Sequence, residues 1–142
     1  MKNLTNNSFK KLFSYAVICS MVFLYSCKSK DGVDPSMADQ VTGTYNVSSI
    51  SQGGLTVNLP VDGVSGEYTV KKLSDSKVTV SYVLKSAGYA DETGQEDATL
   101  QKANDGGIDF YTTGKVGNFN NNKITFDFDD ENGNIKIVAN KK

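Results

Sequence analysis

Lys123-Ile-Thr-Phe-Asp-Phe-Asp129 alternates apolar and polar side chains without interruption. Ile124, Phe126 and Phe128 lie two residues apart, and a hydrophilic residue stands between each pair. Successive side chains on a β-strand point to opposite faces of the sheet, so this period of two places the three apolar residues on one face. The stretch therefore predicts a strand with one face in a core and the other in water.

The same period of two recurs in four other parts of the chain, so 123–129 is one strand of a larger sheet. The other residues predicted to face inward are Val78, Val80, Tyr82 and Leu84, Tyr68 and Val70, Tyr45 and Val47, and Ile135 and Ile137. Segments rich in Gly, Asn, Asp and Ser separate the strands at 74–76, 104–107, 120–122 and 131–133. These residue types favour tight turns, because Gly, Asn and Asp tolerate positive φ.

These strands and turns predict an all-β domain over residues 41–142, built as an antiparallel meander of about eight strands. A meander of this size closes most readily into a small barrel, because closure removes exposed strand edges. A β-sandwich is the alternative. Residues 97–103, Asp-Ala-Thr-Leu-Gln-Lys-Ala, fit either a strand or one to two helical turns.

The composition excludes several classes of chemistry. The 142-residue chain has no His and no Trp, its 15 basic residues are all Lys, and it has two Cys. A His-dependent catalytic triad, a His metal site and an arginine clamp for phosphate are therefore ruled out. Acidic residues are plentiful, but no two of them stand out as a catalytic pair for glycoside hydrolysis. We predict that the protein is not an enzyme and uses no cofactor.

The N-terminus has the features of a secretion signal. Lys2, Lys10 and Lys11 precede an uncharged apolar run from Leu12 to Tyr25. The run of 14 residues is short for a membrane-spanning helix, which needs roughly 17–25 residues. A basic segment followed by a short apolar run is typical of a secretory signal peptide.

The end of that run, Leu24-Tyr-Ser-Cys27, resembles the lipobox of bacterial lipoproteins. Leu24 lies three residues before the cysteine, and the small Ser26 lies directly before it. The resemblance implies that diacylglycerol is attached to the Cys27 thiol and that a peptidase removes residues 1–26. Two or three acyl chains would hold the protein firmly, because each buried methylene contributes about 0.8 kcal/mol and one chain gives only marginal binding.

Two alternatives stand beside this interpretation. Cys19 is a second candidate acceptor, but Ile18 before it is not small. An ordinary signal peptide that contains Cys27 by coincidence is the other. Residues 27–40 are predicted to form the lipidated cysteine and a flexible tether, because the segment is polar and has neither a helical nor a strand period.

The charge of the mature chain bears on its partners. Removing residues 1–26 leaves 12 Lys against 16 acidic residues, a net charge of −4. Nucleic-acid binding depends on clustered basic charge, so we predict none. Attachment to a membrane is predicted to occur through the lipid on Cys27. Lys28 directly after the cysteine resembles the sorting signal for the outer membrane of a gram-negative cell envelope.

Val41-Thr-Gly-Thr-Tyr45 resembles the Gly-x-Trp motif that opens the first strand of lipocalins and their calycin relatives, with Tyr45 in the place of Trp. The stretches 107–111 and 123–127 resemble small lipocalin-like lipoproteins of gram-negative bacteria. The resemblance covers most of 41–142. It implies a calycin-like barrel that binds a small lipophilic or glycan ligand inside. The alternative is a non-catalytic interaction module, a β-sandwich that docks another envelope protein or a polysaccharide.

Six aromatic residues predicted to point inward are the candidate ligand-binding residues. They are Tyr45, Tyr68, Tyr82, Phe110, Phe126 and Phe128. The interior of an eight-stranded barrel is just wide enough to be filled by side chains or to hold one small ligand. The six rings therefore form either a packed core or the lining of a cavity, and alternation alone does not distinguish the two.

Two acidic segments are further candidates for binding. Asp127, Asp129 and Glu131 place oxygen atoms at alternate positions, as a calcium loop does. Gly133 lies one place late for the spacing of an EF-hand, so a polar hairpin tip explains the segment equally. Residues 91–97 are predicted to form the longest loop of the domain, where calcium or a partner could dock, with a solvated loop as the alternative.

Overall fold

The computed structural model describes residues 34–130 and 133–142. One helix and nine strands make up the described chain. They are α2 (Met37–Val41), β1 (Gly43–Gln52), β2 (Leu55–Asn58), β3 (Ser65–Ser74), β4 (Lys77–Lys85), β5 (Glu92–Lys102), β6 (Ile108–Tyr111), β7 (Lys115–Asn120), β8 (Lys123–Asp130) and β9 (Gly133–Lys141).

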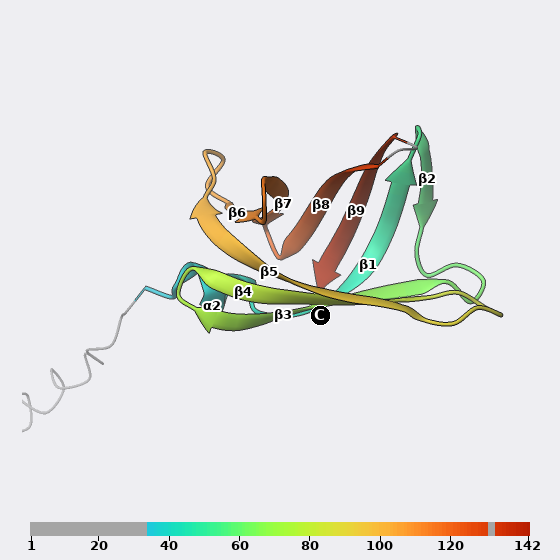
Figure 1. Cartoon of the computed structure of the whole chain (residues 1–142), viewed down its shortest axis with the longest axis horizontal. Helices are drawn as coiled ribbons and strands as arrows, with labels where there is room; N and C mark the ends of the chain where they lie inside the picture. The colour runs from blue at the N-terminus through green and yellow to red at the C-terminus, as the bar shows by residue number, and fades with distance from the viewer. Residues whose placement is uncertain (1–33, 131–132) are drawn as a thin grey trace, which may run out of the picture. The chain divides into compact units, whose positions relative to one another are not determined.

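Eight of the strands close an antiparallel barrel in the order β1, β3, β4, β5, β6, β7, β8 and β9, and β9 pairs back with β1 (Figure 1). β2 is an extra strand that pairs with Ser49–Gln52 at the end of β1. The prediction of an all-β antiparallel meander is confirmed, and the barrel replaces the sandwich alternative. Residues 97–102 belong to β5, so this segment is a strand and not a helix.

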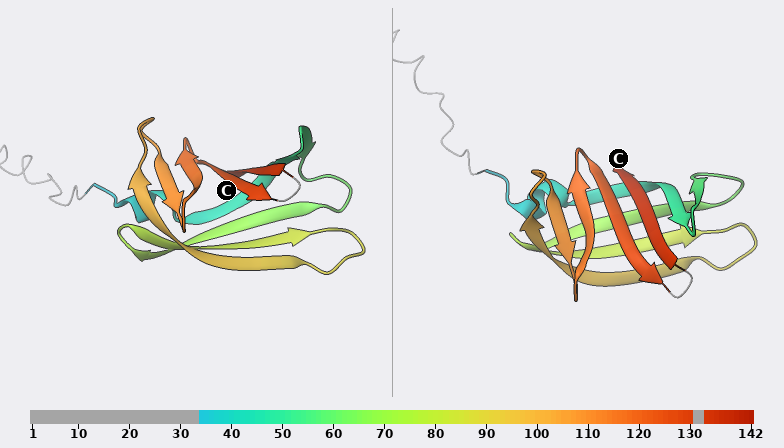
Figure 2. Two further views of the ribbon diagram at one scale, coloured as in Figure 1. Left: turned by 45° about the horizontal axis from the view of Figure 1, so that its top comes forward. Right: turned by 90° about the horizontal axis from the view of Figure 1, so that it is seen from above.

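The barrel wall is continuous at one end and divided at the other. β1 pairs with β3 only over Gly43–Asn46, and β5 pairs with β6 only over Thr99–Lys102. Both short ladders lie at the same end, which we call the closed end. Beyond them, β3, β4 and β5 form one wall, and β8, β9 and β1 form the other (Figures 1 and 2). The loop 86–91 and the turn at Gly53 and Gly54 lie at the opposite, open end.

The packed core lies toward the closed end. The largest side chains that are almost completely buried are Tyr45, Phe110, Leu100, Ile124, Val41, Val70 and Val78. Tyr45 donates a hydrogen bond from its hydroxyl group to the carbonyl oxygen of Val41 at 2.5 Å. Its polar end is therefore satisfied inside the core, as burial of a phenol requires.

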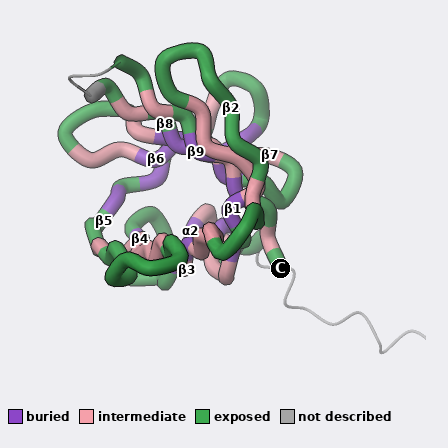
Figure 3. Tube along the Cα trace, turned by 90° about the vertical axis from the view of Figure 1, so that its right-hand side faces the viewer, coloured by how far each residue is buried: buried purple, intermediate pink, exposed green. Residues whose placement is uncertain are grey.

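The predicted alternation of faces holds on every strand that it covered. Tyr45, Val47, Tyr68, Val70, Val78, Ile124, Phe126 and Ile137 are buried, and Val80, Tyr82, Leu84, Phe128 and Ile135 are half-buried against them. The half-buried residues are those nearer the open end. Figure 3 colours the trace by burial and shows buried and half-buried stretches on the strands that form the ring, with exposed residues in the loops.

One strand changes phase because of a β-bulge. Val47 pairs with Ala139 and Ser49 pairs with Val138, so Ser48 is an extra residue in β1. An extra residue reverses the side-chain alternation after it. The inward residues of β1 are therefore Tyr45 and Val47 before the bulge and Ile50 and Gln52 after it.

The helix α2 corrects the predicted tether. Residues 37–40 were expected to be flexible, but they form a helical turn in which Ala38 and Val41 are fully buried. The folded unit accordingly begins at Pro35. A helix of five residues is too short to show an apolar period, which is why the pattern of the sequence did not reveal it. The first strand begins at Gly43 and not at Val41.

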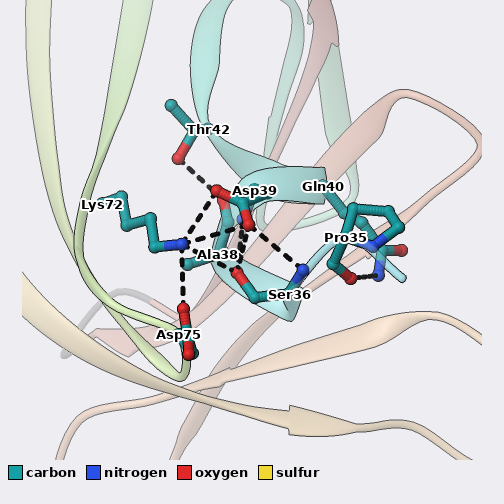
Figure 4. Close-up of polar contacts among 8 residues, drawn as sticks. All are labelled: Pro35, Ser36, Ala38, Asp39, Gln40, Thr42, Lys72 and Asp75. Atoms are coloured by element: carbon teal, nitrogen blue, oxygen red, sulfur yellow. Dashed lines mark hydrogen bonds and ion pairs between the residues drawn. The ribbon is translucent and has the colours of Figure 1, made fainter. Parts of the chain in front are cut away.

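Polar contacts fix this helix to the barrel. Ser36 caps its N-terminus, and the Asp39 carboxylate accepts hydrogen bonds from the backbone and side chain of Ser36, which makes a capping box. The Lys72 ammonium on β3 lies 2.9 Å from Asp39 and 2.9 Å from Asp75 (Figure 4). The amide of Ala38 also donates to the carbonyl oxygen of Asp75, so α2 covers the closed end.

Candidate functional site

A cavity of about 800 Å³ lies between the two walls at the open end. Its floor is the packed core, and its sides come from β1, β3, β4, β5, β7, β8 and β9. The apolar side chains that line it are Ile50, Tyr68, Val80, Tyr82, Leu84, Ala98, Val116, Phe126, Phe128, Ile135 and Ile137. A hollow of this volume with mostly apolar walls is typical of sites for small organic ligands.

Four of the six predicted aromatic residues line this cavity. Tyr68 lies at the centre, with its ring 4.9 Å from that of Phe126 and 5.8 Å from that of Tyr82 between centroids. The Phe128 ring stacks on Phe126 at 5.8 Å. These four rings form a continuous aromatic surface that crosses the interior from β4 and β3 to β8 in the opposite wall, and we call this surface the aromatic wall.

The other two predicted residues belong to the packed core. Neither Tyr45 nor Phe110 lines the cavity, and both rings are fully buried. Tyr45 packs edge-on against Phe119 at 6.4 Å, and Phe110 packs edge-on against Phe126 at 5.7 Å. Two of the six rings thus belong to a packed core and four line a cavity, because the barrel is filled at one end and its walls separate at the other.

Two glycines make room for the rings. A Cβ atom added to Gly94 of β5 would lie 2.4 Å from the Tyr82 ring, its register partner on β4. A Cβ atom added to Gly117 of β7 would lie 2.6 Å from the Phe126 ring and 2.8 Å from the carbonyl oxygen of Thr125. These rings therefore lie flat across the neighbouring strand where a side chain would otherwise stand.

Two carboxylates also face the cavity, which corrects the predicted acidic loop. Residues 92–97 are part of β5, and the loop is confined to 86–91. Val80 pairs with Glu96 and Leu84 pairs with Glu92. Directly opposed residues of an antiparallel pair share a face, so both glutamates stand on the inner face with Val80 and Leu84.

The geometry brings Glu92 close to the tyrosines. The Tyr82 hydroxyl group lies 3.5 Å from a carboxylate oxygen of Glu92. Burial raises the pKa of the Tyr68 phenol well above its usual value, and the neighbouring Tyr82 and Glu92 add to that rise. At neutral pH the Tyr68 hydroxyl group is therefore a neutral donor inside the cavity.

The two glutamates do not have the spacing of a glycoside hydrolase pair. They lie four residues apart on one strand, which is about 13 Å along it at the usual rise per residue. The carboxyl groups of such enzymes lie roughly 5–9.5 Å apart across the scissile bond.

Two of the three calcium candidates, Asp127 and Asp129, lie on β8 (Lys123–Asp130). Asp127 and Asp129 alternate with Phe126 and Phe128 on β8, so they stand on the outer face of the barrel. Glu131 lies outside the described residues. Among residues 34–130 and 133–142, no group of three or more potential ligands could hold a metal ion.

The residues of the predicted lipobox, Leu24, Ser26 and Cys27, also lie outside the described residues, as does Cys19. No helix within the described part of the chain is long and apolar enough to cross a membrane.

Comparisons with known proteins bear on the fold alone. No family model matches the chain, and no curated protein matches it. A solved structure described as a redesigned beta barrel is similar to it with a TM-score of 0.52 and 15% sequence identity. The similarity covers 75% of this chain and 96% of the redesigned barrel. At this level of identity the match supports the barrel architecture.

Sequence reasoning missed several lining residues. Ile50 and Gln52 reach the cavity because of the bulge at Ser48, which no pattern of residue types marks. Glu92 and Glu96 were predicted in a binding loop and not on the inner face of a strand, because charged residues on that face break the apolar alternation. The spacing Glu92, Gly94, Glu96, Ala98 and Leu100 is nevertheless a period of two, and the last two residues could have indicated which face is inner.

Proposed function

We propose that this protein is a lipid-anchored lipoprotein of the cell envelope whose barrel binds a small apolar ligand. The observation that carries the binding function is the cavity of about 800 Å³ with an aromatic wall. A domain whose only task was to fold would gain stability by filling that space, because a cavity forfeits packing contacts. The lipobox-like segment ending at Cys27 supports the anchor.

Binding is tested with N-phenyl-1-naphthylamine, an uncharged aromatic probe whose fluorescence rises in apolar surroundings. The purified protein should bind it at micromolar concentration. Ile135→Trp places an indole in the cavity and should weaken binding at least about tenfold. Lys136→Trp is the matched control, because Lys136 is the next residue of β9 and faces outward. Equal binding by both variants, or no binding by the parent protein, would contradict the proposal.

The anchor is tested by a single substitution. Cys27→Ser should abolish metabolic labelling with palmitate and leave an unprocessed precursor that still carries residues 1–26. Cys19→Ser is the control and should leave labelling intact. Unchanged labelling of Cys27→Ser would reject this residue as the acceptor.

A non-catalytic docking module is the second candidate. Leu55 and Tyr89 near the open end are 77% and 81% exposed, although both are large and apolar. Val57, two residues after Leu55 on β2, is 50% exposed, and a contiguous exposed apolar patch often marks a contact surface. If docking is the function, Leu55→Ser with Tyr89→Ser should abolish crosslinking to an envelope protein in cells and leave probe binding unchanged.

A further inference from the structure

We propose that the cavity selects a small organic cation, an apolar body that carries an ammonium group, over neutral and anionic molecules of the same shape. This inference rests on the proposed ligand-binding function and names its ligand class. It follows from the charges on the inner face of the barrel, from the ring faces beside them and from the volume available.

The charged residues of the cavity have one sign. Among the described residues that line it, the acidic residues are Glu92 and Glu96, and no lysine is present. Both glutamates are held on the inner face by their pairing with Leu84 and Val80. On the opposite wall, Lys136 lies between Ile135 and Ile137 and faces outward. Lys141 of the same strand lies over the rings of Tyr45 and Phe119, which do not line the cavity.

The aromatic wall adds attraction for the same kind of group. The face of an aromatic ring carries negative electrostatic potential, and a cation within about 6 Å of the ring centre is attracted to it. The Tyr82 hydroxyl group is 3.5 Å from Glu92, and the Tyr82 ring is next to that of Tyr68. An ammonium group placed there would contact a ring face and a carboxylate together.

An anionic ligand would meet the opposite conditions. A carboxylate or phosphate group in an apolar hollow needs a positive charge or several donors to replace its water. The two carboxylates, which are exposed to solvent on the inner face, would instead repel it. The cavity volume of about 800 Å³ is in the range for drug-sized ligands, so we commit to a single-chain or aromatic amine.

Selectivity is measured by displacement of N-phenyl-1-naphthylamine with three ligands of equal chain length. They are decyltrimethylammonium, decanol and decanoate, each kept below its micelle concentration at low ionic strength. The ammonium compound should displace the probe at a concentration at least about fivefold lower than decanoate, with decanol between them. Raising the salt concentration should narrow the difference, because salt screens exposed charges.

Two double variants assign the effect to the inner carboxylates. Glu92→Gln with Glu96→Gln should reduce the preference for the ammonium compound to less than about twofold and leave decanol binding unchanged. Asp127→Asn with Asp129→Asn changes the net charge equally on the outer face of β8 and should preserve the preference. Circular dichroism confirms that each variant keeps the fold.

The outcomes separate the two proposals. If the uncharged probe does not bind, the proposed function fails. If the probe binds but the three ligands displace it equally, or decanoate displaces it best, the proposed function stands and the cation inference is overturned. The inference is also overturned if the preference survives in the glutamine variant or disappears in the Asp127 and Asp129 control.

Discussion

At the scale of single residues, Phe126 connects the packed core to the cavity. Its side chain is 3% exposed, and its ring contacts those of Tyr68, Phe110 and Phe128. Phe126→Ala should lower the free energy of unfolding by about 3–5 kcal/mol, as truncation of a buried phenylalanine does. Thr125→Ala on the outer face of the same strand is the control. Urea unfolding measures both, and a loss below about 1 kcal/mol for Phe126→Ala would mean that the ring is not buried.

The two glycines beside the rings should respond differently to the same change. Gly117→Ala places a methyl group against the Thr125 carbonyl oxygen, which cannot move without disturbing β8. We expect a loss of about 1–3 kcal/mol, the usual cost of overpacking. Gly94→Ala meets the outer atoms of the Tyr82 ring, which can swing toward the cavity. Its loss should be less than half as large, and equal losses by urea unfolding would contradict this account.

How much of the site could be predicted depends on what each residue type reveals. Val78, Val80, Tyr82 and Leu84 alternate with other residues because one face of their strand is buried, so the inner faces could be predicted. Which rings line a cavity depends instead on where the ladders end, and no residue type marks that the pairing of β5 with β6 is confined to Thr99–Lys102. The inner position of Glu96 could not be predicted either, because an acidic residue is expected in a solvated loop and not on the inner face of a strand.

At the scale of elements, α2 shows what a short helix needs in order to form. It has too few residues to be stable alone, so its buried face and its cap must hold it. The sequence Ser36-x-x-Asp39 is a readable capping box. The apolar partners that complete the helix come from strands distant in sequence, and for that reason the segment resembled a linker.

The cap makes the helix sensitive to acid. Hydrogen bonds from the Ser36 side chain and from Lys72 lower the pKa of Asp39 below its ordinary value of 3.8. Because the folded-state pKa is the lower one, this contribution to stability is fully present above pH 3.8 and is lost as the pH falls through the folded-state pKa. The urea midpoints of the parent protein and Asp39→Asn should therefore differ at pH 6 and converge at low pH. Asp91→Asn, in the exposed loop 86–91, is the control, and a constant difference at all pH values would refute the linkage.

At the scale of the whole molecule, burial of tyrosine predicts how the barrel responds to alkali. Burial raises the pKa of Tyr45 to about 12 from an ordinary value of 10.0, and it raises that of Tyr68 as well. A raised folded-state pKa means that the contribution to stability is present below pH 10 and is lost as the pH rises toward the folded value. The free energy of unfolding should fall between pH 10 and 12.

The alkaline loss is measured by urea unfolding together with phenolate absorbance at 295 nm. Tyr45→Phe should be less stable at pH 8, because the hydrogen bond to Val41 is gone, and should lose less stability above pH 10. Tyr89→Phe, at an exposed ring, should keep the parent slope. An unchanged slope in Tyr45→Phe would show that this phenol does not couple to folding.

The division between the two walls predicts a pattern of hydrogen–deuterium exchange in β5. Of the part of the chain that the structure describes, no strand pairs with the second edge of β5 between Glu92 and Ala98. In an antiparallel strand, alternate amide groups point to opposite neighbours. About half of the amide protons in this segment should therefore exchange with deuterated water far faster than those of the fully flanked strand β4. Protection that is uniform along β5 would mean that in solution another strand covers this edge.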